Sequence, residues 1–304
     1  MMTKILLQTT IQATPDDWHI GRFDLLRRHL AELRWNDGTP HFEILARDRE
    51  PDAQGDDPLL STLGDSDIDQ LWLFAVDVGD GLSAADSAGI RAFRRRGGGL
   101  VTARDHQDLG LCLCELGTIG RVNFFHSKNP ESDPQRRTRD DTSANIDYPN
   151  YHAGLNGNYQ TISVQDPVHE LLRSSQAPDG VIHRFPAHPH EGAIGCTDLP
   201  FARVIATSTS KITGRAFNSV IVFDGERDHD GTPLGRAVAE STFHHFCDYN
   251  WDTRAGCPSF VTDPPGDEIA RDPAPLAIFK EYVNNIAAWL ADAPALRRSA
   301  PAFH

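Results

Sequence analysis

The clearest indication of the fold is the segment Gly97-Gly98-Gly99-Leu100-Val101-Thr102-Ala103-Arg104-Asp105-His106. A glycine run follows a charged segment with helical character and leads into a short apolar strand. The strand ends abruptly at Asp105 and His106, and a second helix-like segment, 109–116, begins at once. In an open α/β sheet, functional groups gather where the strands end at their carboxyl edge. We therefore expect a functional site at this turn and at a similar later turn, Phe243-His244-His245-Phe246.

Strand and helix patterns alternate before this stretch. The segment 70–76 is a continuous apolar run, as expected of a central parallel strand, and Ser83 is suited to cap the helix after it. The alternation predicts a three-layer, doubly wound α/β fold with a mostly parallel sheet. The expected elements are strands at 4–9, 41–46, 70–76 and 100–103 and helices at 21–35 and 83–96.

The chain changes character after residue 116. Residues 117–159 are polar and rich in Asn, Asp, Arg, Pro and Gly, which predicts a long inserted loop that is functional or disordered. A strand is expected at 159–164, and the strands at 219–223 and 237–243 are expected to form an added antiparallel hairpin. An amphipathic helix at 276–290 should cover the sheet. Because no linker interrupts the pattern, we expect a single domain over residues 1–304.

Composition limits the possible partners. The 304 residues are 39% hydrophobic and 24% charged, with a formal net charge of −14, which argues against nucleic acid or an anionic membrane as a partner. No apolar run approaches the ~20 residues of a membrane span, and the N-terminal apolar run is too short for a secretory signal. The five cysteines have no zinc or disulfide spacing. We expect a cytoplasmic protein with reduced thiols, and a homo-oligomer remains open.

Histidines and one glutamate are the first candidates for chemistry. Histidine is the commonest metal ligand and a natural acid or base near neutral pH. His188 and His190 flank a proline in an extended segment, which directs both imidazoles to one side. With His106 or His244 they could bind a divalent metal, and Glu191 could act as a ligand or base. The alternative is that all of them are loop residues held by hydrogen bonds.

Adjacent residues of a strand point to opposite faces, so one of His244 and His245 should face the pocket. The sequence does not say which.

Carboxylates and aromatic residues are further candidates. Asp77 follows the central strand, where it could orient a histidine or simply form a turn. Asp105 could act as a nucleophile or base, or cap the next helix. The aromatic residues Trp18, Tyr151 and Trp251 could line a pocket for a small-molecule ligand such as a sugar, or pack in the core.

Four pieces of the sequence, in this order, resemble the class I glutamine amidotransferase-like superfamily and, within it, the ThuA-like (trehalose-utilisation) branch. They are the helix and glycine run of 82–100, Asp166-Pro167-Val168-His169, Glu191 after Pro189, and Gly235-Arg236 followed by a strand that ends in His244-His245. The resemblance covers roughly residues 1–251. It implies a flavodoxin-like, class I glutamine amidotransferase-like fold and a role related to sugars.

One departure from the family pattern bears on activity. True amidotransferases carry a cysteine nucleophile at the turn after the glycine-rich strand, where this chain has Asp105-His106. Cys112 and Cys114 lie inside the following helical segment, away from that turn. The departure argues against glutamine hydrolysis.

We therefore expect a ThuA-like protein of undefined activity, and the first hypothesis is an enzyme that processes a small molecule or carbohydrate. The residues expected to do acid–base or metal chemistry are Asp105, His106, Glu191, His244 and His245. A hydrolase that uses Asp105 without a cofactor is the second possibility for an enzyme. The alternative is a non-catalytic ligand-binding or interaction protein on the same fold.

Overall fold

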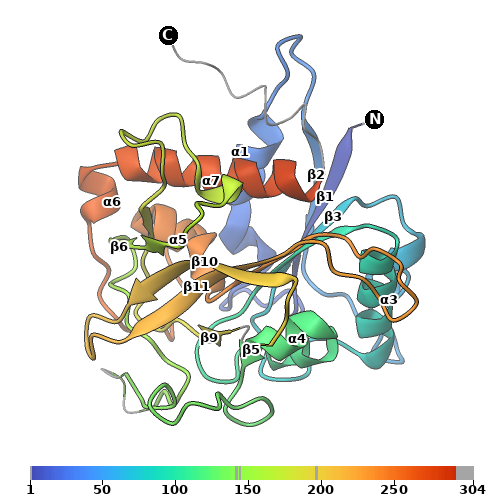
Figure 1. Ribbon diagram of the computed structural model, residues 1–304, viewed down its shortest axis with the longest axis horizontal. Helices are drawn as coiled ribbons and strands as arrows, with labels where there is room; N and C mark the ends of the chain where they lie inside the picture. The colour runs from blue at the N-terminus through green and yellow to red at the C-terminus, as the bar shows by residue number, and fades with distance from the viewer. Residues whose placement is uncertain (1, 141–142, 144, 196–197, 292–304) are drawn as a thin grey trace.

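The centre of the protein is an eight-stranded sheet in the order β2-β1-β3-β4-β12-β11-β10-β7. The computed structural model describes residues 2–140, 143, 145–195 and 198–291 (Figure 1). Parallel pairing joins β2 (Phe42–Arg47), β1 (Thr3–Thr9), β3 (Gln70–Phe74), β4 (Gly99–Ala103) and β12 (Ala237–Glu240). Antiparallel pairing adds β11 (Ala216–Phe223), β10 (Ala202–Thr209) and β7 (Ser163–Val164).

The fold-class prediction is confirmed. Counted along the chain, the five parallel strands have the order 2-1-3-4-5, which is the flavodoxin-like order of a doubly wound sheet. The predicted antiparallel hairpin is present as β11 and β12, in which Val222 pairs with Val238. Two small antiparallel sheets lie beside the main one. One pairs β5 (Asn123–Phe124) with β9 (Ala193–Ile194), and the other pairs β6 (Tyr159–Thr161) with β8 (Arg184–Pro186).

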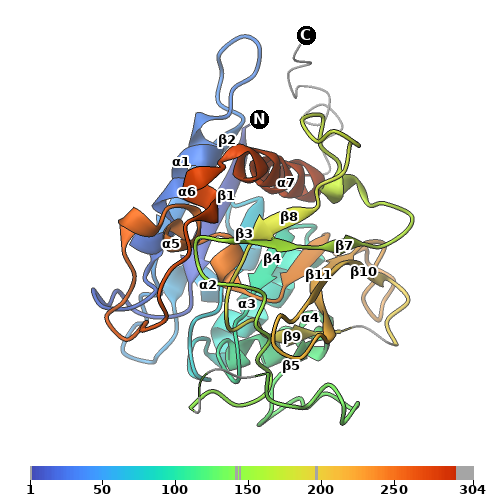
Figure 2. The ribbon, with the colours of Figure 1, turned by 90° about the vertical axis from the view of Figure 1, so that its left-hand side faces the viewer.

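Helices cover both faces of the sheet. Figures 1 and 2 show α1 (Asp24–Glu32) and α7 (Ala274–Leu290) on one side and α3 (Ala84–Arg95) and α4 (Thr118–Val122) on the other. Each side has its own buried apolar cluster. Ser83 caps α3 in a capping box with Asp86, as the sequence indicated. Among the described residues, no helix has the length and hydrophobicity needed to cross a membrane.

Three parallel strands deliver polar residues to one edge. β3, β4 and β12 are neighbours, so the residues that follow them, including Asp77, Asp105 and His244, leave the sheet at its carboxyl edge. The last of these strands ends at Glu240, earlier than the sequence pattern suggested. Thr242 ends it, because its hydroxyl accepts the His244 N–H and begins a 3₁₀ turn, η5 (Phe243–His245).

The segment expected to be a long loop contains α4 and β5 (Asn123–Phe124), which pairs with β9 (Ala193–Ile194). The strand expected at 159–164 is divided, because β6 (Tyr159–Thr161) pairs with β8 (Arg184–Pro186) while β7 joins the main sheet. The remaining helices are α2 (Pro58–Ser61), α5 (Asp248–Trp251) and α6 (Glu268–Arg271), with 3₁₀ turns at Ile20–Phe23, Leu63–Asp65, Leu111–Glu115, Glu170–Leu172 and Thr253–Ala255.

Replacing Phe279 of α7 with alanine should lower the free energy of unfolding by about 3–5 kcal/mol, because a fully buried ring would leave a cavity. This ring lies 4.9 Å from Phe185 and 5.7 Å from Tyr282, measured between centroids. Urea denaturation of both variants measures the effect, with Ile278→Ala as the matched control on the partly buried face. An equal loss in the two variants would contradict the packing described for α7.

Candidate functional site

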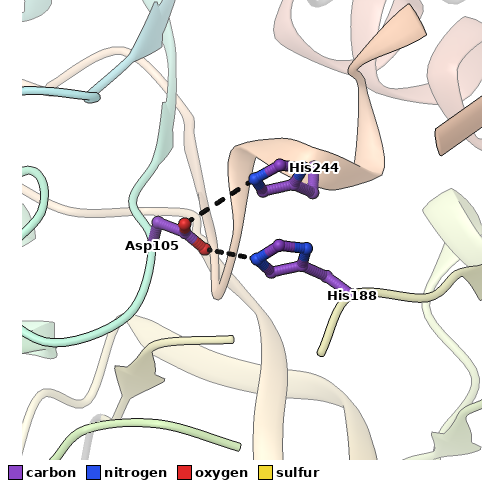
Figure 3. Close-up of side chains that lie close together, drawn as sticks. All are labelled: Asp105, His188 and His244. Carbon is purple, nitrogen blue, oxygen red and sulfur yellow. Dashed lines mark ion pairs between the residues drawn. The ribbon is translucent and has the colours of Figure 1, made fainter. Parts of the chain in front are cut away.

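Asp105, His188 and His244 meet at the carboxyl edge of the sheet (Figure 3). Asp105 follows β4, His244 lies in η5, and His188 comes from the segment between β8 and β9. The Nε2 atom of His188 is 3.5 Å from Asp105 Oδ1, and Nε2 of His244 is 3.7 Å from Asp105 Oδ2. The two imidazole rings stack, with centroids 3.5 Å apart and planes 7° from parallel. We call these three residues the trio; all of them are buried.

A chain of amide hydrogen bonds fixes the protons of both imidazoles. The side-chain amide of Asn250 donates to the backbone carbonyl of Ala187 at 2.7 Å, so its nitrogen is identified by an acceptor that cannot be exchanged. The same nitrogen donates to Asn156 Oδ1 at 2.9 Å. Asn250 Oδ1 therefore faces Nδ1 of His244 at 2.9 Å, and Asn156 Oδ1 faces Nδ1 of His188 at 2.8 Å. Both Nδ1 atoms must carry hydrogen, and both Nε2 atoms face Asp105.

The electrostatics of the trio favour neutral imidazoles beside an ionised carboxylate. Burial lowers the pKa of His188 to about 4, although Asp105 opposes the shift. Burial also lowers the pKa of His244 well below its usual value. For Asp105 burial acts upward, but the imidazoles of His188 and His106 outweigh it and hold the pKa of this carboxyl well below its usual range. Near neutral pH the two Nε2 lone pairs thus point toward a negative charge.

Two more histidines connect the trio to solvent. His106 Nδ1 lies 3.1 Å from Asp105 Oδ2, and because the carboxylate can only accept, this Nδ1 carries hydrogen. The ring of His190 is 5.6 Å from that of His106, and its Nε2 is 3.2 Å from Asp263 Oδ2. The exposed fraction of the side chain rises from 2% for Asp105 to 20% for His106 and 37% for Asp263. Solvent therefore approaches from the side of His106 and Asp263.

The buried guanidinium of Arg104 joins the segments that form the site. It donates to the carbonyls of Asp105 at 2.8 Å and Ala193 at 3.2 Å, and also to those of Gln107 and Phe124. Burial lowers the pKa of Arg104 to about 9. Its own carbonyl accepts from Phe243 N at 2.7 Å, which places the turn that carries His244.

Gly192 leaves the space for this guanidinium, because a Cβ there would lie 2.4 Å from Arg104 Nε and from the carbonyl oxygen of Asp105. The glycine thus allows the segment after His190 to approach the end of β4 closely.

Glu191 and His245 lie in a second, separate cluster. His245 Nδ1 is 2.9 Å from Glu240 Oε2, and its Nε2 is 3.7 Å from Glu191 Oε2. All three side chains are fully buried. Burial alone would lower the pKa of His245, but the nearby carboxylates of Glu191 and Glu240 raise it to about 9. We call this group the Glu191–His245–Glu240 clamp. His244 therefore faces Asp105, whereas the neighbouring His245 belongs to the clamp.

Neighbouring side chains complete the clamp. The Ser241 hydroxyl donates to Glu191 Oε2 at 2.6 Å, Gln160 donates to Glu191 Oε1, and the Tyr282 hydroxyl donates to Glu240. The clamp therefore fastens the segment that carries His188 and His190 to the end of β12 and to α7.

The remaining predicted residues, which are Trp18, Asp77, Tyr151 and Trp251, do not form one group. Trp18 contacts the trio, with its ring edge-on to His244 at 4.6 Å. Asp77 accepts from Thr10 Oγ1 at 2.7 Å and from Cys112 Sγ at 2.9 Å. Tyr151 stacks on Phe217 in a small apolar cluster, and Trp251 donates to the carbonyl of His245 and packs beside α7.

Sequence patterns did not point to the residues that hold these side chains in place. Thr242 donates to Asp105 Oδ1 at 2.9 Å, and Asn156, Asn250 and Asp263 each contact a histidine of the site. Thr242 could have been identified from the sequence, because it lies two residues before His244. No sequence signal marked Asn156.

The clamp should make stability depend on pH. The pKa of His245 rises from about 6.5 in the unfolded chain to about 9 in the folded protein, so the stabilisation is complete below about pH 6.5 and is lost as pH rises through about 9. At 1.36 kcal/mol per pH unit this is about 3 kcal/mol.

Chemical denaturation between pH 6 and 10 measures the effect, and His245→Gln should have the flatter profile. The exposed His183 supplies the control, since His183→Gln should follow the wild type. Parallel profiles for wild type and His245→Gln would show that the clamp holds no charged imidazole.

Comparison with known proteins identifies a shared fold and no family. No protein-family model matches the chain, and no curated protein matches it significantly. Among solved structures, the "mmIFT52 N-terminal domain" has a TM-score of 0.52 at 11% identity, over 99% of this chain and 99% of that one. The "Trypanosoma brucei CTPS - glutaminase domain with bound acivicin" has a TM-score of 0.45 at 12% identity, over 94% of each chain. The first likeness shows the fold alone, and the second is too weak to carry an argument.

Proposed function

We propose that this protein is an enzyme that processes a small, neutral, hydroxyl-rich molecule such as a carbohydrate by acid–base chemistry at the carboxyl edge of the sheet. The observation that carries the proposal is the Asp105–His106 pair. A buried carboxylate holds Nδ1–H of a partly exposed imidazole, which leaves Nε2 as the nitrogen that takes up or releases a proton. The ThuA-like assignment belongs to the same proposal and rests on the sequence resemblance.

The contacts of Asp105 favour an orienting role over a nucleophilic one. Oδ1 accepts from Thr242, and Oδ2 accepts from His106. Both oxygens are therefore engaged, and the side chain is buried. These contacts support the acid–base mechanism over a hydrolase in which Asp105 attacks the substrate.

The charges around His106 and His190 support a neutral substrate. Asp105 and Asp263 lie on either side of His106 and His190, and the whole chain carries a formal net charge of −14. Both features disfavour an anionic ligand. Imidazole and carboxylate groups can accept and donate hydrogen bonds to hydroxyls, which suits a sugar.

The thiols support the proposal that glutamine hydrolysis is not the reaction. The turn after β4 contains Asp105 and His106, and Cys112 is buried with its thiol donating to Asp77. Burial raises the pKa of Cys112 well above its ordinary value, so the thiolate needed for nucleophilic attack is disfavoured.

The competing proposal is a non-catalytic ligand-binding or interaction protein. The depth of the trio favours it, because His188, His244 and Asp105 are buried and reach solvent only past other side chains. In that case the same groups would bind a ligand without transferring a proton.

Titration calorimetry and product analysis with trehalose, maltose, glucose and sorbitol test the proposal. We expect wild-type protein to bind and convert at least one of them. His106→Asn should still bind that sugar but convert it about 100-fold more slowly or worse, as expected when an acid–base group is lost. His229→Gln, on a highly exposed histidine, is the matched control and should behave as wild type.

Binding without conversion by wild-type protein would favour the non-catalytic alternative. Absence of binding to every sugar of the panel would contradict the proposed substrate class.

A further inference from the structure

The trio brings three hydrogen-bond acceptors together with no hydrogen between them. The carbonyl of Ala187 and the amides of Asn250 and Asn156 assign the imidazole hydrogens to Nδ1 of His188 and His244. In their neutral forms both imidazoles then direct an Nε2 lone pair at the carboxylate. Within the described part of the chain, His188 Nε2 is buried without a hydrogen-bond partner. A buried acceptor in this state is costly, so a positively charged species between these atoms would stabilise the site.

The distances distinguish a metal ion from a shared proton. A charge-assisted N–H···O bond between an imidazolium and a carboxylate is about 2.7–2.9 Å long. The two Nε2-to-oxygen separations are 3.5 and 3.7 Å, too long for such a bond. Metal–ligand bonds of about 2.0–2.1 Å in tetrahedral geometry place neighbouring ligand atoms about 3.4 Å apart. One potential ligand atom of each residue also lies within 4.8 Å of the other two.

The hydrogen bonds around the trio match those that usually orient the side chains of a metal site. Metal-bound histidines usually donate their second ring N–H to an oxygen acceptor, and bound carboxylates are themselves hydrogen-bonded. Here the Asn156 and Asn250 oxygens accept from the two imidazoles, and Thr242 donates to Asp105. The segments that carry the ligands are thus oriented before any ion arrives.

We infer that Asp105, His188 and His244 form a binding site for one divalent transition-metal ion, with the two Nε2 atoms and one carboxylate oxygen as ligands (Figure 3). Two imidazoles and a carboxylate suit zinc or iron(II). Three protein ligands leave a coordination position for water, which is the pattern of a catalytic site and not of a closed structural one. The metal would be a cofactor at the site of the proposed function. The inference rests on that function only for the chemical role of the ion, not for its binding.

The sequence prediction placed the metal at His188 and His190. His190 instead contacts Asn150 and Asp263, on the side from which solvent approaches the trio. Its ring is 5.8 Å from that of His188, so it lies beside the proposed ion site and not among the three ligands.

Metal binding should change the stacking of the two imidazoles. The Nε2 lone pairs of parallel rings lie in two separate parallel planes, so one ion can lie in both ring planes only if one ring tilts relative to the other. The ring of His244 stacks on Phe243 at 4.4 Å and meets the edge of Trp18 at 4.6 Å. We expect the tilt to occur mainly at His188.

Elemental analysis after metal loading tests the inference. Full-length protein is stripped with a chelator, incubated with ZnCl₂ or, without oxygen, with an iron(II) salt, and desalted. We expect wild type to retain one equivalent of at least one metal. The ligand variants Asp105→Asn, His188→Gln and His244→Gln should each bind at least about 100-fold more weakly, and Asn250→Leu, which keeps all three ligands but removes the amide that orients them, about 10–100-fold more weakly. His183→Gln, at an exposed site, should equal wild type.

A cobalt(II) spectrum of wild-type protein gives a second readout that does not depend on whether a variant folds. We expect visible bands of a nitrogen- and oxygen-ligated ion, without a thiolate charge-transfer band. Absence of stoichiometric metal in wild type, or full retention by ligand variants whose circular dichroism matches wild type, would overturn the inference. If the metal inference fails in this way, sugar binding and conversion can still support the proposed function. Bound metal without sugar binding would refute only the proposed function.

Discussion

The guanidinium of Arg104 is the interaction on which the geometry of the site depends. It is fully buried and bonds to carbonyls from the turn after β4, from β5 and from β9. Its backbone carbonyl also holds the turn that begins at Phe243. A buried cation without these acceptors would severely destabilise the folded protein. The turn after β4, β5, β9 and the turn at Phe243 are therefore constrained to meet at this point. Asp105 is the next residue, which explains why the site forms there.

The histidines of the site divide into two environments within a few residues. His244 stacks against His188 and faces Asp105, whereas His245 is enclosed by Glu191 and Glu240. The first environment has one carboxylate shared by three imidazoles, so burial keeps His188 and His244 neutral. The second has two carboxylates around one imidazole, which keeps His245 charged. Neutral imidazoles are available as ligands or bases, while a charged imidazole between two carboxylates holds segments together.

The two environments are mechanically linked. His190 and Glu191 are adjacent, as are His244 and His245, so each of the two segments contributes one residue to the clamp and one to the group of histidines around Asp105. The Gly192 N–H also bonds to the Ser241 carbonyl at 2.9 Å. The clamp thereby fixes the distance between the segments that carry His188 and His244. Segments held in this way are positioned before a ligand arrives, which lowers the cost of binding.

The sequence by itself determined the layered α/β class, the central parallel strands, the β11–β12 hairpin and the covering helix α7, because local periodicity and turn residues encode these elements. It also directed attention to Asp105 and His244, since both follow strands that end at the carboxyl edge. Three features became visible in the folded protein alone: His188 joins them, Glu191 and His245 form a separate clamp, and Asn156 and Asn250 fix the imidazole protons. These outcomes depend on hydrogen bonds between segments far apart in the chain, and a 3₁₀ turn where a continued strand was expected sets which way His244 and His245 point.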